Sequence, residues 1–394
     1  MISSKHQDLL NGINDREVIE VCQALVRIKS VNPPGSERAI AEFAAGYLNK
    51  AGLQVELIEH GAERASVLAR LKGSGELPGV LCSAHLDTVP VGVEKWIRDP
   101  FSGDLEEGKV WGRGSADMKG GMAAMMAAGK ALVEAGSALR GDLILAFTAG
   151  EEVDSLGAAA VAKRQDILPL QAILVSEPSD NEVFIAEKGA LWLQIDTYGQ
   201  TAHGSMPHLG HNALMMMVRL IYALEELNVP FQADPLLGDF SRSFNTIAGG
   251  VATNVVPDRC TLTVDMRTVP GQDHRAIVDQ FEGVIAALKK QDSNFRATLS
   301  TLNDRPPVRT DSGHPAVRRF IQVLTGVTGQ AAEPAGVRYY TDASTYIPAW
   351  KDVPMIICGP GQAGQAHQPN EFVEISKLTD SVKIYLLALL EFLT

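Results

Sequence analysis

Apolar residues form two kinds of pattern along the chain, a helical repeat and short continuous runs. Around residues 16–29 and 37–52 the apolar positions recur at helical spacing, which predicts two amphipathic helices. Short, continuous apolar runs follow at residues 79–85, 142–150 and 171–178. Such runs predict strands that are covered on both faces, as in a largely parallel sheet.

Longer apolar segments predict the helices that connect these strands. Residues 120–136 are rich in Ala and Met, so they predict a crossover helix whose methionines pack in the core. Near the C-terminus the same alternation returns, with a helix at 315–329, a strand at 353–361 and a final helix at 375–392. The two ends of the chain are therefore expected to build one α/β domain.

The middle of the chain follows a different order. Its expected elements are a strand at 191–199, a helix at 211–228, strands at 245–256 and 260–268, a helix near 273–290 and a strand at 295–301. The order β-α-β-β-α-β is that of the split βαβ, or ferredoxin-like, unit, which has its own core. The sequence therefore predicts an α/β domain from residues 1–189 and 303–394, with a largely parallel central sheet and helices on both faces. An α+β domain at residues 190–302 is inserted into it.

The overall composition is that of a globular protein with two domains. The 394 residues exceed the size at which one core usually stops growing, and 45% of them are hydrophobic against 21% charged. The net charge of −12 argues against a nucleic-acid partner, which normally requires a basic surface. The N-terminus shows no apolar run of signal-peptide length and no later run approaches a membrane span, so we expect a cytoplasmic protein without a membrane partner.

The four cysteines predict buried thiols. Cys22, Cys82, Cys260 and Cys358 are widely scattered, and at least two of them lie inside apolar, strand-like runs. Isolated cysteines in such runs are typically reduced core residues rather than disulfides or metal ligands.

Candidate metal ligands directly follow three of the predicted strands. The first strand ends on His85, with Asp87 two residues later; Glu151 and Glu152 follow the second strand, and Glu177 follows the third. In open α/β sheets, functional groups gather at the carboxyl ends of the strands. One such acidic residue would mean little, because caps and turns use Asp and Glu routinely, but three strand ends in succession indicate a site.

The acidic residues beside these ligands suggest further roles. In extended chain His85 and Asp87 point the same way, so the Asp87 carboxylate could accept the second ring N–H of a metal-bound His85. A capped turn with a solvated Asp87 is the alternative. Glu151 and Glu152 would repel each other if both were buried and ionised, so they require a cation, a shared proton or exposure in an acidic turn. With zinc present, one can coordinate the metal and the other can deprotonate the metal-bound water, whose pKa is then about 7.

Two further ligands are expected from glycine-rich loops. Asp117 lies among glycines at positions 112, 114, 120 and 121, which allow tight turns and close approach to an ion. The segment matches neither a dinucleotide fingerprint nor a Walker loop, and a carboxylate that faces two cations can bridge them, so Asp117 is the expected bridging ligand. His367 lies in the loop at 361–371, after a strand that should join the same sheet; a merely exposed histidine is the alternative.

The chain contains, in this order, the motifs SAHLDTVP, GRGSADMKGG, TAGEE, SEPS, GQTAHGSMPHLGHNA, ATNVVPD, DMR and AHQPNE. With them it resembles the zinc aminoacylase and exopeptidase family that includes acetylornithine deacetylase, succinyl-diaminopimelate desuccinylase, aminoacylase-1 and carboxypeptidase G. The resemblance extends from residue 30 to residue 373, with no expected ligand position substituted. It implies a zinc-peptidase-like catalytic domain and an inserted dimerisation domain.

The resemblance distributes the ligands over two Zn²⁺ ions per chain, which Co²⁺ or Mn²⁺ could replace. It implies that one zinc takes His85 and Glu177. The other takes Glu152 and His367, and Asp117 joins the two ions.

The resemblance also implies roles for four other residues. Glu151 becomes the general base and acid. In this family the inserted domain pairs two subunits, and a histidine of the GQTAHG motif stabilises the tetrahedral oxyanion in the partner's active site; that role falls on His203, for which a satisfied loop histidine is the alternative. Asn254 and Arg267 are implied to touch the substrate. Arg267 could bind a substrate carboxylate by a bidentate fork, or be a surface charge at a strand end.

The expected reaction is the hydrolysis of an amide bond in a small molecule, in which Glu151 deprotonates a water held by two zinc ions. A deacylase of N-acyl amino acids is the preferred hypothesis. A metallo-exopeptidase, whether dipeptidase or carboxypeptidase, could use the same site, as could an amidohydrolase of an unusual amide, carbamate or aryl amine. The loop at 338–347, with Asp342, is expected to shape the pocket. Outside this class the alternatives are a catalytically inactive metal or peptide binder and a nucleotide-binding protein, which the absent phosphate motifs disfavour.

Overall fold

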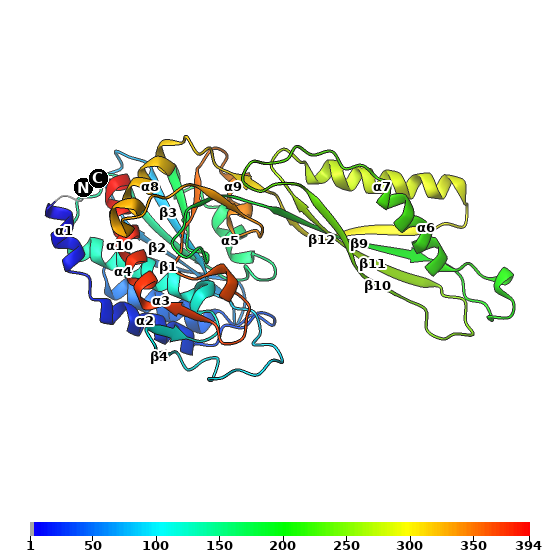
Figure 1. Cartoon of the computed structure of the whole chain (residues 1–394), viewed down its shortest axis with the longest axis horizontal. Coiled ribbons are helices and arrows are strands. Elements are labelled where there is room, and N and C mark those ends of the chain that lie inside the picture. The colour runs from blue at the N-terminus through cyan, green and yellow to red at the C-terminus, as the bar shows by residue number, and fades with distance from the viewer. Residues whose placement is uncertain (1–3) are drawn as a thin grey trace. The chain divides into compact units, whose positions relative to one another are not determined.

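Helices and strands alternate along the computed structural model, which describes residues 4–394 (Figure 1). The contacts between residues divide the chain into two compact units. Unit 1 contains the residues up to Ala186 together with Arg309–Ala335 and Thr341–Thr394, and unit 2 contains Glu187–Val308 and Gly336–Tyr340. The sequence predicted an insertion at 190–302 and gave no sign that residues 336–340 return to the inserted unit.

The largest sheet has a parallel centre. Its nine strands are β1 (Gln54–Glu59), β2 (Ala65–Leu71), β3 (Gly79–His85), β6 (Leu143–Thr148), β7 (Leu170–Val175), β8 (Phe184–Glu187), β13 (Val308–Arg309), β14 (Ala335–Val337) and β15 (Met355–Ile357). They follow the order β1-β2-β6-β3-β7-β15-β8-β13, with β14 paired to β8. The central strands β6-β3-β7-β15 are parallel, which confirms the prediction. The strands β1 and β2, which the sequence pattern did not predict, add an antiparallel edge.

Helices cover this sheet, and every residue of β3 and β6 is buried, as expected for strands covered on both faces. The helices of unit 1 are α1 (Ser4–Asn11), α2 (Asp15–Arg27), α3 (Arg38–Lys50), α4 (Gly120–Glu134), α5 (Leu156–Ala162), α8 (Pro315–Thr328), α9 (Ala343–Ala349) and α10 (Ile375–Leu393), with short turns η1 (Ser115–Lys119) and η3 (Ala363–Gln365). The helices α2, α4 and α10 pack against one another, and α5 contacts α9. Among residues 4–394, no helix combines the length and the apolar character needed to cross a bilayer.

A small antiparallel sheet joins two segments that are distant in sequence. It consists of β4 (Asp104–Glu106), β5 (Lys109–Trp111) and β16 (Phe372–Glu374), in the order β16-β5-β4. Beyond the pairing of β16 with β5, the backbone N–H of Gly112 donates to the carbonyl oxygen of Glu371 at 2.8 Å. The glycine-rich segment around Asp117 and the loop at 361–371 are therefore held side by side.

Glycines let these loops approach the ends of the central strands. A Cβ at Gly121 would lie 2.5 Å from the carbonyl oxygen of Ser176, which follows β7 directly. A Cβ at Gly361 would lie 2.2 Å from the carbonyl oxygen of Ala116. Because real Cβ atoms cannot come this close to a backbone oxygen, larger residues at either position would push the loops and strand ends apart.

Unit 2 contains the predicted split βαβ unit. Its elements are β9 (Gly189–Tyr198), η2 (Pro207–Leu209), α6 (Ala213–Glu225), β10 (Ser241–Gly249), β11 (Arg259–Thr268), α7 (His274–Gln291) and β12 (Ala297–Arg305). The sheet order is β10-β11-β9-β12, all antiparallel, and α6 and α7 share one apolar core with it. The largest difference from the predicted strands is at β10, which ends at Gly249 because the positive φ of Gly250 turns the chain before the predicted end at residue 256.

The four cysteines are buried and none forms a disulfide, as predicted. Burial raises the pKa of Cys22 to about 12 and the pKa of Cys358 to about 12. A thiol with such a pKa stays protonated at neutral pH and is a poor nucleophile and metal ligand. The candidate chemistry of unit 1 therefore belongs to its histidines and carboxylates.

Candidate metal centre

Three parallel strands present candidate ligands at the same edge of the sheet. His85 is the last residue of β3 and pairs in register with Thr148, the last residue of β6. The turn after β6 carries Glu151 and Glu152, and Glu177 follows β7, the other neighbour of β3. Because the strands run parallel, their carboxyl ends meet, and the side chains that follow them converge.

Asp117 lies between two histidines, one at the end of β3 and one in the loop at 361–371. Its Oδ1 is 3.0 Å from Nε2 of His85, and its Oδ2 is 3.4 Å from Nε2 of His367. Each carboxylate oxygen thus faces a different imidazole. A carboxylate placed in this way could coordinate a different cation with each oxygen, and Asp117 stays the predicted bridging ligand.

The other candidate ligands gather around this centre. Ligand atoms of His85, Glu151 and Glu177 all lie within 4.8 Å of one another, and so do those of His85, Asp117 and Glu152. Nε2 of His367 is 3.2 Å from Glu152, and Nε2 of His85 is 3.9 Å from Oε1 of Glu177. The structure therefore brings together all five predicted ligands and Glu151. Two imidazoles and three carboxylates form a donor set that suits Zn²⁺ and related first-row divalent cations.

Asp87 makes different contacts from those that the sequence suggested. Nδ1 of His85 lies 2.9 Å from the backbone carbonyl oxygen of Asp87 and 3.8 Å from its carboxylate, so the carbonyl is the acceptor of the ring N–H. The carboxylate instead accepts the backbone N–H groups of residues 150–152 at 3.0, 3.1 and 3.2 Å. Asp87 thereby orients two parts of the site. Its backbone carbonyl holds the His85 ring, and its carboxylate holds the turn that carries Glu151 and Glu152.

The site holds more acidic than basic side chains, and all of them except His367 are largely buried. Burial, followed by the charge of a neighbouring carboxylate, raises the pKa of Glu151 and of Glu177 well above the usual value. Hydrogen bonding to Asp117 raises the pKa of His367 to about 10. The carboxylates around His85 raise its pKa in spite of its burial, and both imidazoles hold the pKa of Asp117 below its usual range although burial opposes this. Divalent cations would neutralise the excess negative charge.

We expect the metal-free protein to lose stability as the pH rises from 6.5 to about 10. In this range the folded protein keeps the proton of His367, which the unfolded chain releases near 6.5, so the free energy of unfolding falls with pH. The raised pKa values of Glu151 and Glu177 act in the same direction above pH 4.5, because the unfolded chain releases these protons there while burial disfavours the ionised carboxylates of the folded protein. Denaturant unfolding of chelator-treated protein at several pH values measures this slope.

Two controls accompany this measurement. The His367→Gln variant should show a shallower slope, and saturating zinc should flatten or reverse it, because zinc binds the deprotonated ligands of the native state. A metal-free protein whose stability rises with pH across this range would contradict the prediction.

The predicted substrate residues all lie in unit 2. His203 is exposed, and its Nδ1 lies 2.7 Å from Oγ of Ser205. Asn254 lies beside it, since the N–H of Gly204 donates to the Asn254 carbonyl oxygen at 2.7 Å. Arg267, on β11, is paired with Asp265 of the same strand, at 3.1 Å. A substrate carboxylate at Arg267 would therefore have to share the guanidinium with Asp265.

Three buried charged residues near the site are absent from the predicted ligand set. Arg113 and Glu371 pair with each other at 2.7 Å. Asp342 is buried, and its carboxylate accepts the Thr148 hydroxyl at 2.5 Å. Its charge adds to the forces that raise the pKa of Glu151, so this residue affects the acidity of the centre as well as its shape. The sequence offered a signal for two of them, because Arg113 is a charged residue inside the motif GRGSADMKGG and Glu371 is one inside AHQPNE.

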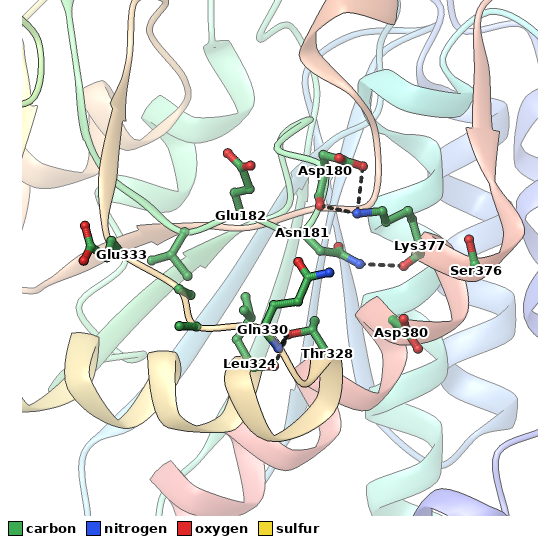
Figure 2. A pocket seen from close by; sticks show the side chains of 13 residues that line it. Asp180, Asn181, Glu182, Leu324, Thr328, Gln330, Glu333, Ser376, Lys377 and Asp380 are labelled. Carbon is green, nitrogen blue, oxygen red and sulfur yellow. Dashed lines mark hydrogen bonds and ion pairs between the residues drawn. The ribbon is translucent and has the colours of Figure 1, made fainter.

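Figure 2 shows a polar pocket of unit 1, about 440 Å³ in volume, that is bordered by residues 180–183, α8 and α10. Lys377 donates to the backbone carbonyl of Asp180 at 3.0 Å and lies 3.1 Å from its carboxylate, while the amide of Asn181 donates to the carbonyl of Lys377 at 2.9 Å. None of the predicted site residues lines this pocket. The candidate chemistry of unit 1 therefore stays with the cluster around Asp117.

Comparisons with known proteins agree with this geometry. The model of peptidase family M20/M25/M40 matches residues 81–391. A probable succinyl-diaminopimelate desuccinylase of Staphylococcus epidermidis is 26% identical, over 95% of this chain and 97% of its own. Among solved structures, an M20 family metallo-carboxypeptidase from Sulfolobus solfataricus has a TM-score of 0.79 at 18% identity, covering 95% of this chain and 99% of its own. A dinuclear metal-binding M20 peptidase from Bacillus subtilis has a TM-score of 0.71 at 16% identity, covering 96% and 98%.

Proposed function

The chain belongs to peptidase family M20/M25/M40 and is a metal-dependent hydrolase of amide bonds, and on this premise we propose that it deacylates N-acyl amino acids. The observation that carries the proposal is Asp117, whose two carboxylate oxygens lie 3.0 Å from the imidazole of His85 and 3.4 Å from that of His367. Similarity to a probable desuccinylase over nearly its whole length supports an acyl group as the part that is removed.

Two divalent cations fit the donor set, and we propose Zn²⁺, with Co²⁺ or Mn²⁺ able to replace it. His85 and Glu177 would hold one ion, Glu152 and His367 the other, and Asp117 both. When bound, the cations would polarise the amide carbonyl and acidify a water molecule. Their charge would also favour the ionised carboxylates that burial disfavours.

Glu151 is the proposed general base. It is 7% exposed, and ligand atoms of His85 and Glu177 lie within 4.8 Å of its carboxylate. In this role Glu151 takes a proton from the attacking water and returns it to the leaving amine. The hydrogen bond from its backbone N–H to Asp87, at 3.1 Å, limits the movement of the turn during both transfers.

We propose a homodimer that forms through unit 2. Two large apolar side chains of α6, Met215 and Tyr222, are 54% and 68% exposed, and β10 is an edge strand on which Ile247 is 54% exposed. An exposed apolar helix face next to an open strand edge supports pairing with a second copy. His203 would then serve the partner's site by stabilising the tetrahedral oxygen.

Two residues of unit 2 are the proposed substrate contacts. Asn254 and Arg267 would bind the substrate, with Arg267 directed to a carboxylate. Free, buried cysteines are typical of a reducing compartment, which supports a cytoplasmic location.

Metal content and activity test the proposal together. We expect two equivalents of metal per chain and loss of turnover after chelation, with recovery on addition of Zn²⁺ or Co²⁺. A protein that binds two equivalents but hydrolyses no amide would be the inactive binder. Turnover that survives complete metal removal would refute the metallohydrolase mechanism.

A substrate panel separates the deacylase from its main alternative. N-succinyl and N-acetyl amino acids should be cleaved faster than dipeptides, and the carboxamide analogue of the best substrate should be cleaved more slowly because it lacks the carboxylate. The reverse preference, for dipeptides or for C-terminal residues of peptides, would identify a metallo-exopeptidase.

A further inference from the structure

A buried ion pair connects the loops that carry Asp117 and His367. Glu371 is 0% exposed and Arg113 is 2% exposed, and Nη1 of Arg113 donates to Oε2 of Glu371 at 2.7 Å. Arg113 lies just after β5 and Glu371 just before β16, the strand that pairs with β5. The pair therefore lies where the small sheet opens into the two ligand-bearing loops.

The Glu371 carboxylate holds the backbone of the Asp117 loop. Its Oε1 accepts the backbone N–H groups of Ala116 and Asp117, at 2.9 and 3.0 Å. Its Oε2 accepts the N–H of Gly114 at 2.9 Å in addition to the guanidinium of Arg113. Each oxygen thus has two donors, which is the full capacity of a carboxylate oxygen. These bonds set the orientation of the Asp117 backbone.

Arg113 extends the connection to the His367 loop. Its guanidinium donates to the carbonyl oxygens of His367 and Gln368, each at 3.3 Å, and to that of Pro90 at 3.4 Å. The side chain of His367 is 51% exposed, so packing restrains it less than it restrains the buried His85. These bonds therefore help to fix the position of the His367 backbone.

We propose that the Arg113–Glu371 pair is a positioning device for one of the two cation sites, the one formed by Asp117, Glu152 and His367. The inference rests on the proposed two-cation function. Asp117 and His367 reach a common ion only while their loops keep a fixed separation, and this one ion pair bonds to the backbone of both. The other site shares Asp117 but is less dependent on the pair, because its two remaining ligands are His85, at the end of β3, and Glu177, just after β7, and strand pairing sets the separation of these strands.

Zinc titration of chelator-treated Glu371→Gln protein tests the inference. Glutamine keeps the shape but replaces one acceptor oxygen with an NH2 group that faces two donors. We expect the equivalent held by Asp117, Glu152 and His367 to bind about 10–100-fold more weakly than in the wild type, and the other, which shares only Asp117 with it, to weaken clearly less. Arg113→Lys keeps the charge but loses the planar fork, so it should cause the same selective loss.

The matched control is Glu17→Gln, which breaks the ion pair with Lys130, 2.6 Å long, between α2 and α4. It should lower stability and leave both zinc affinities unchanged. If Glu371→Gln weakens both equivalents alike, or neither, the pair is only a structural support and the proposal is overturned. Should that variant fail to fold, the Arg113→Lys titration decides by the same criterion. A wild-type protein that binds fewer than two equivalents would instead refute the proposed function, so the two failures are distinguishable.

Discussion

Replacement of Glu151 by Gln is expected to lower kcat by about 10²–10⁴-fold while the protein keeps two bound metal ions. The amide has the shape of the carboxyl group but cannot take a proton from water. Because Glu151 is 7% exposed and its backbone is bonded to Asp87, the glutamine should remain in the same position. Turnover of an N-acyl amino acid and metal content, measured on the same sample, test this expectation.

The adjacent residue supplies the matched control. Glu152 lies 3.2 Å from Nε2 of His367, so Glu152→Gln should weaken binding of the cation that these two residues hold. The two variants should therefore lose different properties. Glu151→Gln should lose turnover and keep its metal, whereas Glu152→Gln should lose metal. Near-normal turnover in Glu151→Gln would exclude Glu151 as the base.

Replacement of His203 by Ala is expected to lower kcat by about 10²–10³-fold without changing metal content, since one donor to the tetrahedral oxygen is removed. Its effect on KM should be smaller, because the oxygen acquires full negative charge only in the transition state. His208, which is also exposed and lies in the same stretch of unit 2, provides the control variant His208→Ala. Steady-state kinetics of the three proteins test the assignment. Equal effects of the two substitutions would contradict it.

Mixing two inactive variants tests whether His203 acts across subunits. In a mixed dimer of Glu151→Gln and His203→Ala chains, one site receives both native residues and the other receives neither. At random pairing about a quarter of the sites should then be intact, so activity should return to about that fraction. Mixed dimers that form but remain inactive would place His203 in its own subunit's site or outside catalysis.

Local patterns predicted most of the elements that carry the candidate ligands. The strand predicted at 79–85 is β3, residue for residue, and the helices predicted at 16–29, 120–136 and 375–392 are all present. These segments succeed because burial on both faces leaves continuous apolar runs, and burial on one face leaves a helical period. The ends of three parallel strands then bring His85, the Glu151–Glu152 pair and Glu177 together.

Other features depend on contacts that no local pattern records. The pairing of β5 with β16 joins residues 109–111 to residues 372–374. Each strand has only three residues, too few to show a periodic pattern that distinguishes it from a loop. The two-residue spacing of His85 and Asp87 predicted a common direction. It could not predict that the backbone carbonyl would take the ring N–H, because that choice depends on the turn at 150–152 that occupies the carboxylate.

The residue types of the centre and the strand ends that carry them can therefore be read from the chain itself, because periodicity and glycine placement are local properties. The convergence of Asp117 and His367 depends on folding, since it requires the small sheet and the buried Arg113–Glu371 pair, and the two residues of that pair are 258 positions apart in the chain. The acidity of these groups also depends on folding. Glu151 and Glu152 are adjacent in the sequence, but their pKa values are raised only once the fold excludes water from both carboxyl groups.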